Sequence, residues 1–452
     1  MEAGEPRSAP HRREVVLLHS PSYLEALGRL PVHQQRERRT LALLEACFPD
    51  GELSQHVQLV APTVATREQL EAFHSRDYID ILYEFGAESE SLSAVQEQGE
   101  MQLLEEFGLV DDAYVFPGLF GYCSYVAGAT LTAVDALLHL MKSRLRDEVL
   151  LLLPPVAINL GGGRHHAMRS HASGFCYVND AVLGIQRLVS KGRVKRVLVV
   201  DIDVHHGDGT QEAFYYSEKV TTISFHLREP AFFPGTGADS EVGAGRGKHN
   251  NVNVPLQRGI TDGQFHALFQ RVVDKAVGAV EPEMVVLVCG VDTLARDPLG
   301  GFNLTSGGIC DCVETVMALQ LPVLLLGAGG YSGADASKSF TAVVATVIGQ
   351  RRNLPDQIPE HAYYEEYLPN VQLATTAAAH RPNLNMGETL LETGDRAIAT
   401  LEQAASIRQS RTQQISKKRA RDSTSGLSVA DAQIGFVRIS SELVEDAAIP
   451  TG

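Results

Sequence analysis

Two carboxylates and an imidazole recur at alternate positions in one short segment. Residues 199–209 read VVDIDVHHGDG, so Asp201, Asp203 and His205 follow an apolar run at every second position. In a β-strand this period of two places the three side chains on one face. Carboxylates and imidazole together suit a divalent metal, because buried carboxylates without a cation repel each other. The segment therefore predicts a metal site at the end of a strand, in preference to a set of polar strand caps.

Two adjacent histidines form a second group with chemical potential. His165 and His166 close the glycine-rich segment NLGGGRHHA at residues 159–167. Histidine titrates near neutral pH, which suits it to general acid–base work. A bare pair of histidines is often incidental, but here Asp201 and Asp208 could orient the two rings as carboxylate partners do. We therefore predict that both histidines face the same cavity as the metal site.

A carboxylate and a phenol follow two further apolar runs. Asp292 ends the segment VVLVCGVD, and Tyr331 ends LLLGAGGY. Asp203, His205 and Asp292 could supply three protein ligands and leave one position open for water, as catalytic zinc sites do. An oxygen-rich set leaves iron or manganese open as well. The glycine-rich turn before Tyr331 lacks the Lys and Ser/Thr of a phosphate-binding loop, and a phenol can donate a hydrogen bond to a developing oxyanion.

Short apolar runs alternate with longer amphipathic segments along the chain. The runs predict buried strands at 149–153, 196–203, 221–226, 284–290 and 321–327. The amphipathic segments predict helices at 125–140, 180–190, 262–277, 305–319 and 337–349. This alternation predicts an α/β fold with a parallel sheet covered by helices on both faces. The chemical groups above would then lie at the carboxyl ends of the strands, where open parallel sheets carry their sites.

Composition narrows the class of protein. The 452 residues include 39 basic and 55 acidic side chains, and 39 − 55 gives a net charge of −16. This acidic balance argues against nucleic acid as a direct partner, and 44% hydrophobic residues exclude a wholly disordered chain. The six cysteines form no C-x-x-C pair, which favours a reduced intracellular protein. The start lacks a secretory signal, and the apolar run at 149–158 is too short to cross a membrane.

The pattern predicts one large domain with flexible ends. We expect a disordered N-terminus at 1–13, a single domain at 14–409 with an acidic insert near 84–106, and a flexible tail at 410–452. No Lys or Arg occurs from residue 77 to 141, whereas 12 acids do. This stretch is either a solvated acidic loop or a surface that attracts Lys-rich substrates.

The tail carries a short basic cluster. It comprises Lys417, Lys418, Arg419 and Arg421. Such a cluster resembles a nuclear localisation signal, although short basic runs also arise by chance in solvated linkers.

Six segments occur in an order that resembles a known family. They are GGGRHHA, SGFCYVND, VVDIDVHHGDG, FFPGTG, GVDT and GAGGY. Together they resemble the zinc-dependent class I histone deacetylases over residues 14–409, and their motif details resemble the histone deacetylase 8 branch. The acidic insert and the tail lie outside the family core and indicate a divergent, protozoan-type lineage. The resemblance implies a single arginase/deacetylase-like domain with a central, mostly parallel sheet. It also implies hydrolysis of acetyl or other acyl groups from lysine side chains of histones or other proteins, in the nucleus and also the cytoplasm.

The resemblance implies a role for each matching residue. Asp203, His205 and Asp292 match the Zn²⁺ ligands, with Fe²⁺ as an alternative metal. His165 and His166 match the two active-site histidines, with Asp201 and Asp208 as their carboxylate partners, and Tyr331 matches the tyrosine that polarises the acyl carbonyl. Our own choice for the general base is His166, with His165 as electrostatic partner or proton donor, although the two rings titrate together and the resemblance does not divide their roles. Phe175, Phe233 and Gly174 match the acyl-lysine tunnel, Asp112 its rim and Leu299 a further substrate contact. Arg36 matches an internal channel, and the structural K⁺ ligands are Asp201, Asp203, His205, Ser224 and Phe225.

Several positions depart from the family pattern. Arg164 stands where Trp usually precedes the two histidines, and Asp112 is followed by Ala-Tyr instead of Cys-Pro. Pro298 and the segment 332–334 lack the two arginines of the inositol-phosphate corepressor site, so we expect that site to be absent. The alternatives are an acetylpolyamine deacetylase, an arginase-like manganese hydrolase, or a non-catalytic scaffold that binds acyl-lysine.

Overall fold

The computed structural model describes residues 13–33, 35–86, 98–147, 153–192 and 194–425. The chain divides into two units, Met1–Ala405 and Ser406–Gly452. The N-terminus expected to be disordered, the centre of the acidic insert and the last 27 residues of the expected tail lie outside the described residues, apart from Arg13 in the first strand. Helix α13 (Gly387–Ser425) continues past residue 410, where the sequence predicted a flexible tail to begin.

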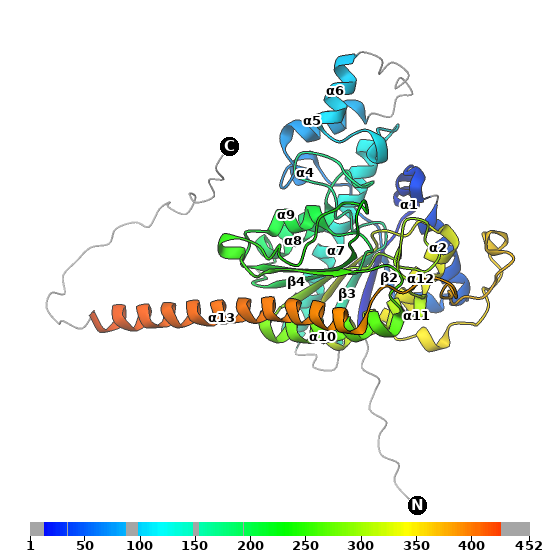
Figure 1. Ribbon diagram of the computed structural model, residues 1–452. Helices are drawn as coiled ribbons and strands as arrows, with labels where there is room; N and C mark the ends of the chain where they lie inside the picture. Colours follow the sequence, from blue (N-terminus) through cyan, green and yellow to red (C-terminus); the bar gives the residue numbers. More distant parts are fainter. Residues whose placement is uncertain (1–12, 34, 87–97, 148–152, 193, 426–452) are drawn as a thin grey trace, which may run out of the picture. The chain divides into compact units, whose positions relative to one another are not determined.

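One parallel sheet organises the first unit (Figure 1). Its eight described strands lie in the order β2-β1-β3-β8-β7-β4-β5-β6, and each pair of neighbouring strands is parallel. The strands are β1 (Arg13–Leu18), β2 (Gln58–Val60), β3 (Leu153–Asn159), β4 (Val197–Asp201), β5 (Val220–Leu227), β6 (Asn251–Leu256), β7 (Met284–Val288) and β8 (Val323–Leu326). The predicted α/β fold with a mostly parallel sheet is confirmed.

Helices cover both faces of the sheet. The described helices are α1 (Pro21–Leu27), α2 (Arg36–Cys47), α3 (Glu52–His56), α4 (Arg67–Leu70), α5 (Arg76–Phe85), α6 (Gln98–Glu106), α7 (Leu119–Asp147), α8 (Asp180–Ser190), α9 (Asp208–Phe214), α10 (Asp262–Val280), α11 (Ser306–Ala318), α12 (Gly333–Val347) and α13. Short 3-10 helices lie at Pro31–His33, Asp111–Ala113, Gly245–Gly247, Arg351–Asn353 and Tyr364–Tyr367.

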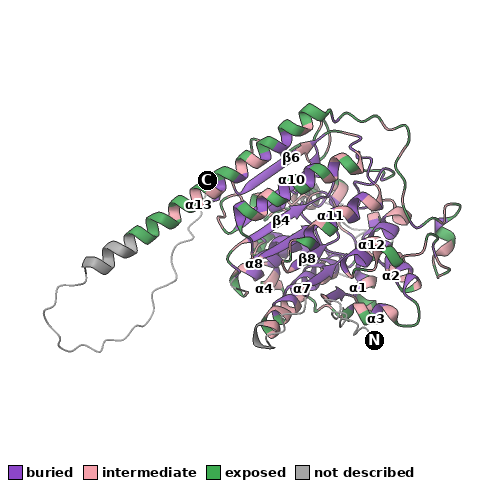
Figure 2. Ribbon diagram, turned by 90° about the horizontal axis from the view of Figure 1, so that it is seen from below, coloured by how far each residue is buried: buried purple, intermediate pink, exposed green. Residues whose placement is uncertain are grey.

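Alternate residues of each strand enter two separate cores. Val15 and Leu17 of β1 join one core with α2, α10, α11 and α12, whereas Val16 and Leu18 join the other with α5, α7 and α8. The same split holds in β8, where Leu325 and Leu324 point to opposite faces. Figure 2 shows this buried interior between helices whose outer sides are exposed. Because both faces are covered, the strands read as nearly continuous apolar runs in the sequence.

Helix α7, the longest described helix that lies wholly in the first unit, is unusually apolar. Within α7, residues Leu119–Arg144 are long and apolar enough to cross a membrane by length and composition. However, 61% of the most apolar window is buried inside the protein, where α7 packs against α8, β1 and β3. The helix therefore has the composition of a core helix that is covered by its own chain.

The structure corrects one predicted strand. The sequence predicted a strand at 149–153 that ends before the two prolines, but β3 begins at Leu153 and includes both Pro154 and Pro155. Pairing with β1 is irregular at this point, where the register shifts between Arg13 and Val15. A proline lacks an N–H donor, and it is tolerated where a strand starts beside such an irregularity. Residues 148–152 lie outside the described residues.

The sequence pattern did not predict three of the strands, β1, β2 and β6. Strand β2 has only three residues and lies at one edge of the sheet, and β6 lies at the other edge. In β6 the apolar residues alternate with Asn251 and Asn253, whose amides donate to Gln211. Strand β1 is buried, but its six residues follow directly on the polar N-terminal segment.

Candidate active site

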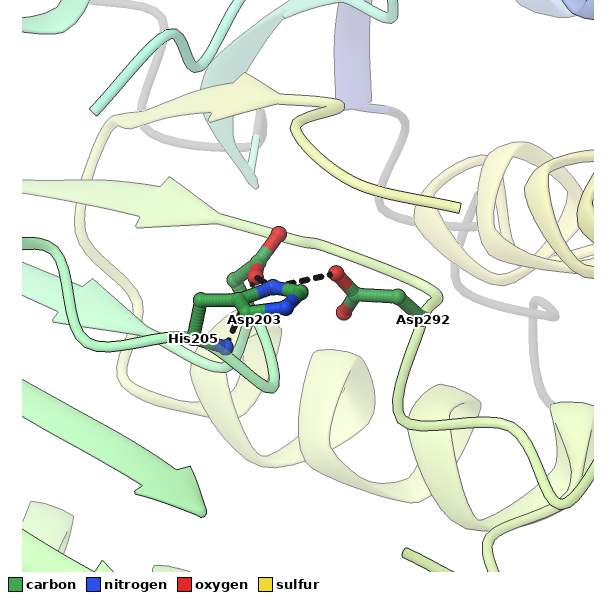
Figure 3. Close-up of side chains that lie close together, drawn as sticks. All are labelled: Asp203, His205 and Asp292. Carbon is green, nitrogen blue, oxygen red and sulfur yellow. Dashed lines mark hydrogen bonds and ion pairs between the residues drawn. The ribbon is translucent and has the colours of Figure 1, made fainter. Parts of the chain in front are cut away.

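Three metal-binding side chains meet at the carboxyl ends of neighbouring strands. Asp203 and His205 follow β4, Asp292 follows β7, and all three are buried. His205 Nδ1 lies 3.1 Å from Asp203 Oδ1 and 3.1 Å from Asp292 Oδ2. Figure 3 shows these contacts, with the imidazole between the two carboxylates. One ligand atom from each residue lies within 4.8 Å of the others, so one ion can reach all three.

The backbone that carries Asp203 and His205 is a loop, whereas the sequence predicted a strand. Strand β4 stops at Asp201, so Asp203 and His205 lie in the following loop and the predicted alternation along a strand is wrong for them. Instead, each carboxylate supports the next turn: Asp201 Oδ1 accepts from the Asp203 amide at 3.0 Å, and Asp203 Oδ1 accepts from the His205 amide at 2.9 Å. Hydrogen bonds between side chain and backbone thus set the spacing of the two groups.

Neighbouring main-chain amides orient the two carboxylates. Asp203 Oδ2 accepts from the Gly329 amide at 2.8 Å, and Asp292 Oδ1 accepts from the Val204 amide at 2.9 Å. Each carboxylate therefore keeps its other oxygen for His205. A Cβ at Gly329 would lie 2.1 Å from Asp292 Oδ2, so only glycine fits beside the cluster.

The charges of this donor set fit a divalent cation. Burial, followed by the charge of Asp203, raises the pKa of Asp292 to about 8. Two buried carboxylates so close together are costly unless positive charge lies between them. Two carboxylate oxygens and one imidazole nitrogen match a three-ligand catalytic zinc site, and they also accept other first-row metals.

Each histidine of the pair is bound to its own carboxylate. His165 Nδ1 donates to Asp201 Oδ2 at 2.7 Å, and His166 Nδ1 donates to Asp208 Oδ1 at 2.7 Å. The two ring centroids lie 4.0 Å apart. Both pairs are buried, and in each ring Nε2 is left for other partners. The structure thus brings together all four residues as the sequence analysis expected.

The surroundings separate the protonation states of the two histidines. Burial opposes charge on His165, but Asp201 and Asp203 outweigh it and raise the pKa of His165 to about 9. Burial, together with the charge of His165, lowers the pKa of His166 to about 4. At neutral pH His166 is therefore the ring that can accept a proton, and His165 is the cation beside it.

The ring of Tyr331 lies close to the rings of His205 and Phe175. Its ring centroid is 6.4 Å from that of His205 and 5.7 Å from that of Phe175. Burial, followed by the charges of Asp292 and Asp203, raises the pKa of Tyr331 well above its ordinary value. The phenol therefore keeps its proton and can act as a hydrogen-bond donor.

Two residues support the turn that carries Tyr331. Asp297 Oδ2 accepts from the Tyr331 amide at 2.7 Å, and Arg36 Nη1 donates to the carbonyls of Ala328 and Gly330 at 3.0 and 3.1 Å. Arg36 is fully buried, and its other nitrogens bond Glu37. The family resemblance pointed to Arg36, but Asp297 was missed, because a single Asp between Arg296 and Pro298 belongs to no periodic pattern.

A pocket of about 260 Å³ opens onto these groups. Its lining comprises Asp112, His166, Gly174, Phe175, His205, Phe232, Phe233, Leu299 and Tyr331. All five residues predicted to bind the substrate are therefore in one cavity with two proposed catalytic residues and one metal ligand. Two larger cavities of about 530 Å³ lie elsewhere, and their linings include none of the predicted site residues.

The wall of this pocket depends on an unusual backbone. Gly174 and Phe175 both have positive φ, of 54° and 61°. A Cβ at Gly174 would lie 2.7 Å from the His166 ring and 2.9 Å from the Phe233 ring. Glycine therefore lets the two rings approach, and a strained Phe175 is the type of residue that functional sites retain. Phe232, which stacks on His205 at 5.2 Å, was missed although its motif was recognised.

The residues predicted to hold potassium lie next to the cluster. Asp201 and Ser224 are partners in the register of β4 and β5, and Phe225 follows on β5. Ser224 Oγ is 2.9 Å from His226 Nδ1. No group of three His, Cys, Asp or Glu ligands other than the Asp203 cluster occurs among the residues that the structure describes. The potassium site thus stays a prediction.

Comparisons with known proteins agree with this geometry. Residues 30–347 match the histone deacetylase domain, which is more than half of the chain. The chain is 38% identical to histone deacetylase 8 of Xenopus tropicalis over 379 residues, which cover 83% of this chain and 95% of that protein. It is 37% identical to histone deacetylase 8 of Danio rerio over 389 residues, covering 86% and 94%. It is 39% identical to histone deacetylase 9 of Arabidopsis thaliana over 333 residues, covering 74% and 72%.

These matches confirm the predicted class I relationship and its histone deacetylase 8-like branch. They also span every segment from which the site is built, from the two histidines to the turn before Tyr331. The chain therefore belongs to the histone deacetylase family, whose members are metal-dependent hydrolases that remove acetyl groups from lysine side chains of histones or other proteins.

Proposed function

We propose that this protein is a zinc hydrolase in which Asp203, His205 and Asp292 hold the metal and the adjoining pocket receives an acyl-lysine side chain. The observation that carries the proposal is the shared lining: one cavity contains His166, His205 and Tyr331 together with Phe175 and Phe233. An apolar, narrow cavity suits the methylene chain of lysine, and polar groups at its base suit the amide.

The groups at the base of the pocket have different roles in the reaction. A zinc ion bound there would polarise the acyl carbonyl and lower the pKa of water. His166 Nε2 accepts the proton of the attacking water, since Asp208 holds Nδ1 as the donor. The Tyr331 hydroxyl donates to the carbonyl oxygen as negative charge develops on it. His165 stabilises that charge or returns a proton to the departing amine, so that the C–N bond breaks to free lysine and a carboxylate.

The rim of the pocket orients the substrate. The half-buried Asp112 carboxylate accepts a hydrogen bond from the Gly174 amide. Burial is the main cause that raises the pKa of Asp112. Asp112 would accept hydrogen bonds from the main chain of a bound peptide, and Leu299 would contact its surface. Potassium would bind beside Asp201, Ser224 and Phe225 and brace the loop after β4. The enzyme would act in the nucleus, as suits a family that acts on histones, and also in the cytoplasm.

Turnover of a defined panel tests this proposal. Purified protein, stripped with a chelator and reloaded with Zn²⁺, Fe²⁺ or Mn²⁺, would be given acetyl-lysine peptides, longer acyl-lysine peptides and acetylpolyamines. We expect release of acetate and free lysine from the peptides, with bound metal near one equivalent. Preference for acetylpolyamines would favour that substrate class, and peptide binding without turnover under every metal would favour a scaffold.

A further inference from the structure

A buried arginine faces a buried histidine next to the proposed site. Arg164, directly before the two catalytic histidines in sequence, is only 3% exposed, and so is His33. Arg164 Nη1 lies 3.4 Å from His33 Nε2, and Arg164 Nη2 lies 3.3 Å from His33 Nδ1. The guanidinium thus faces the whole imidazole ring and not one nitrogen alone. Arg164 Nη2 also donates to the Gly161 carbonyl at 2.9 Å, which fixes it in place.

His33 also contacts Tyr331, and its Nδ1 lies 3.9 Å from Glu37 Oε1. The two ring centroids lie 5.9 Å apart with planes tilted by 45°. Phe175 packs on the same phenol at 5.7 Å, so the ring of Tyr331 contacts both an imidazole and a phenyl group. Loss of one neighbour would let the phenol ring change its orientation, because the quadrupoles of adjacent rings favour specific tilted arrangements.

The electrostatics of this pair favour a neutral imidazole. Burial, followed by the charges of Arg36 and Arg164, lowers the pKa of His33 well below its ordinary value. A neutral ring between a cation and a phenol adds no second positive charge beside the metal cluster. It can therefore accept the guanidinium contact and still serve as a packing partner for Tyr331.

We propose that Arg164 and His33 are positioning residues for Tyr331: the guanidinium holds the imidazole, and the imidazole holds the phenol in line with the acyl carbonyl. The proposal rests on the proposed role of Tyr331 as an oxyanion donor. Neither Arg164 nor His33 lines the substrate pocket. Their loss should therefore change kcat while KM stays nearly constant, since small misplacement of a catalytic group is costly in rate.

A double-mutant cycle separates positioning from simple stability. His33→Ala should lower kcat on an acetyl-lysine peptide by about 10-fold or more in the wild-type background. In a Tyr331→Phe background the same change should alter kcat by less than about 2-fold, because no hydroxyl remains to be positioned. His33→Phe restores a flat ring that Arg164 can face, and it should recover most of the lost kcat.

Two further variants test whether a loss of kcat comes from misfolding. Arg164→Lys keeps a charge but cannot face both ring nitrogens, so it should repeat the His33→Ala pattern with folding intact. Tyr78→Phe is a matched control: it removes a buried hydroxyl that donates to the Tyr177 carbonyl at 2.6 Å, away from Tyr331. It should lower the thermal midpoint and leave kcat of the folded enzyme unchanged in both backgrounds.

The outcomes test the positioning role of His33 and Arg164 separately from the catalytic role of Tyr331. An equal loss in both backgrounds, or no loss in the wild type, would overturn the positioning role and leave the role of Tyr331 intact. Wild-type turnover by Tyr331→Phe alone would overturn the proposed role of Tyr331, and with it this inference. Metal content and thermal midpoint measured for every variant identify any loss that comes from unfolding.

Discussion

The carboxylate of Asp297 accepts a 2.7 Å hydrogen bond from the main-chain amide of Tyr331. It also accepts from the Ser332 amide at 3.3 Å and, through its other oxygen, from the Leu299 amide at 2.9 Å. One buried side chain thus ties the turn of the proposed oxyanion donor to a residue of the pocket wall. Its removal would leave three amides without this acceptor.

We expect Asp297→Ala to impair catalysis and stability together. The free energy of unfolding should fall by about 1–3 kcal/mol, the cost of buried amides left without a partner. A misplaced Tyr331 should also lower kcat by about 10-fold or more. Asp262→Ala is the control, since its carboxylate likewise accepts from a main-chain amide, that of Thr305 at 2.8 Å, but far along the chain from Tyr331. Denaturant unfolding and initial rates should show lost stability in both variants and lost kcat only in Asp297→Ala.

Removal of either carboxylate should empty the proposed metal site. Asp203→Ala and Asp292→Ala each delete one of only three protein ligands, so we expect loss of bound metal and of turnover. Asp135→Ala, which breaks a surface ion pair with Arg187 and Lys191, should keep both. Metal analysis of the purified variants is the measurement. Full metal stoichiometry in either site variant would show that the ligand set is wrong.

Loss of the phenol hydroxyl should slow the reaction without loss of metal. Tyr331→Phe keeps the ring between His33 and Phe175 and deletes one oxyanion donor, which typically costs about 10²–10³ in rate. Metal content and thermal midpoint should match the wild type. Turnover close to that of the wild type would mean that Tyr331 only packs.

Stability should fall as the pH drops below 6.5, in part because of His74. This ring is 2% exposed, accepts from the Asn179 amide through Nε2 and contacts the Arg169 carbonyl through Nδ1. Burial lowers its pKa to about 4, whereas the unfolded chain has about 6.5. The unfolded state thus binds the proton first, so stability is full above pH 6.5 and is lost toward pH 4, by roughly 3 kcal/mol in total.

A glutamine substitution isolates this contribution. His74→Gln should be less stable at pH 7 and lose less stability between pH 6.5 and 4 than the wild type. His139→Gln, at an exposed position of α7, is the control for the substitution itself. Denaturant melts at several pH values measure both slopes. Equal slopes for His74→Gln and the wild type would contradict the depressed pKa.

The basic cluster of the tail should contribute to nuclear targeting. Replacement of Lys417, Lys418, Arg419 and Arg421 by Ala should shift a tagged protein toward the cytoplasm and leave the activity of cell extracts unchanged. All four residues belong to α13, beyond every segment that forms the pocket. Imaging and fractionation measure the distribution, and an unchanged distribution would mean that the cluster is only a solvated part of the helix.

The sequence by itself determined the class of fold and pointed to most residues of the proposed site. Apolar runs that alternate with amphipathic segments require a covered parallel sheet, because each run needs burial on both sides. Helix α8 has the predicted bounds, since Asn179 accepts from the Val182 amide and caps its start. Asp201, His205, Asp292 and the two histidines were found because each group follows an apolar run, and parallel strands gather their carboxyl ends at one edge.

Tertiary structure decided which distant residues complete the site. Strand order places β7 between β8 and β4, which brings Asp292 within 3.1 Å of His205 across 87 positions in the chain. No local pattern marks Asp297 or His33, because Tyr331 lies 34 positions from Asp297 and Arg164 lies 131 positions from His33, and an isolated polar residue has no periodicity. Arg164 departs from the family pattern, and only the tertiary structure gives it a partner, His33. Long-range packing, which depends on the order and register of strands, gives these side chains their roles.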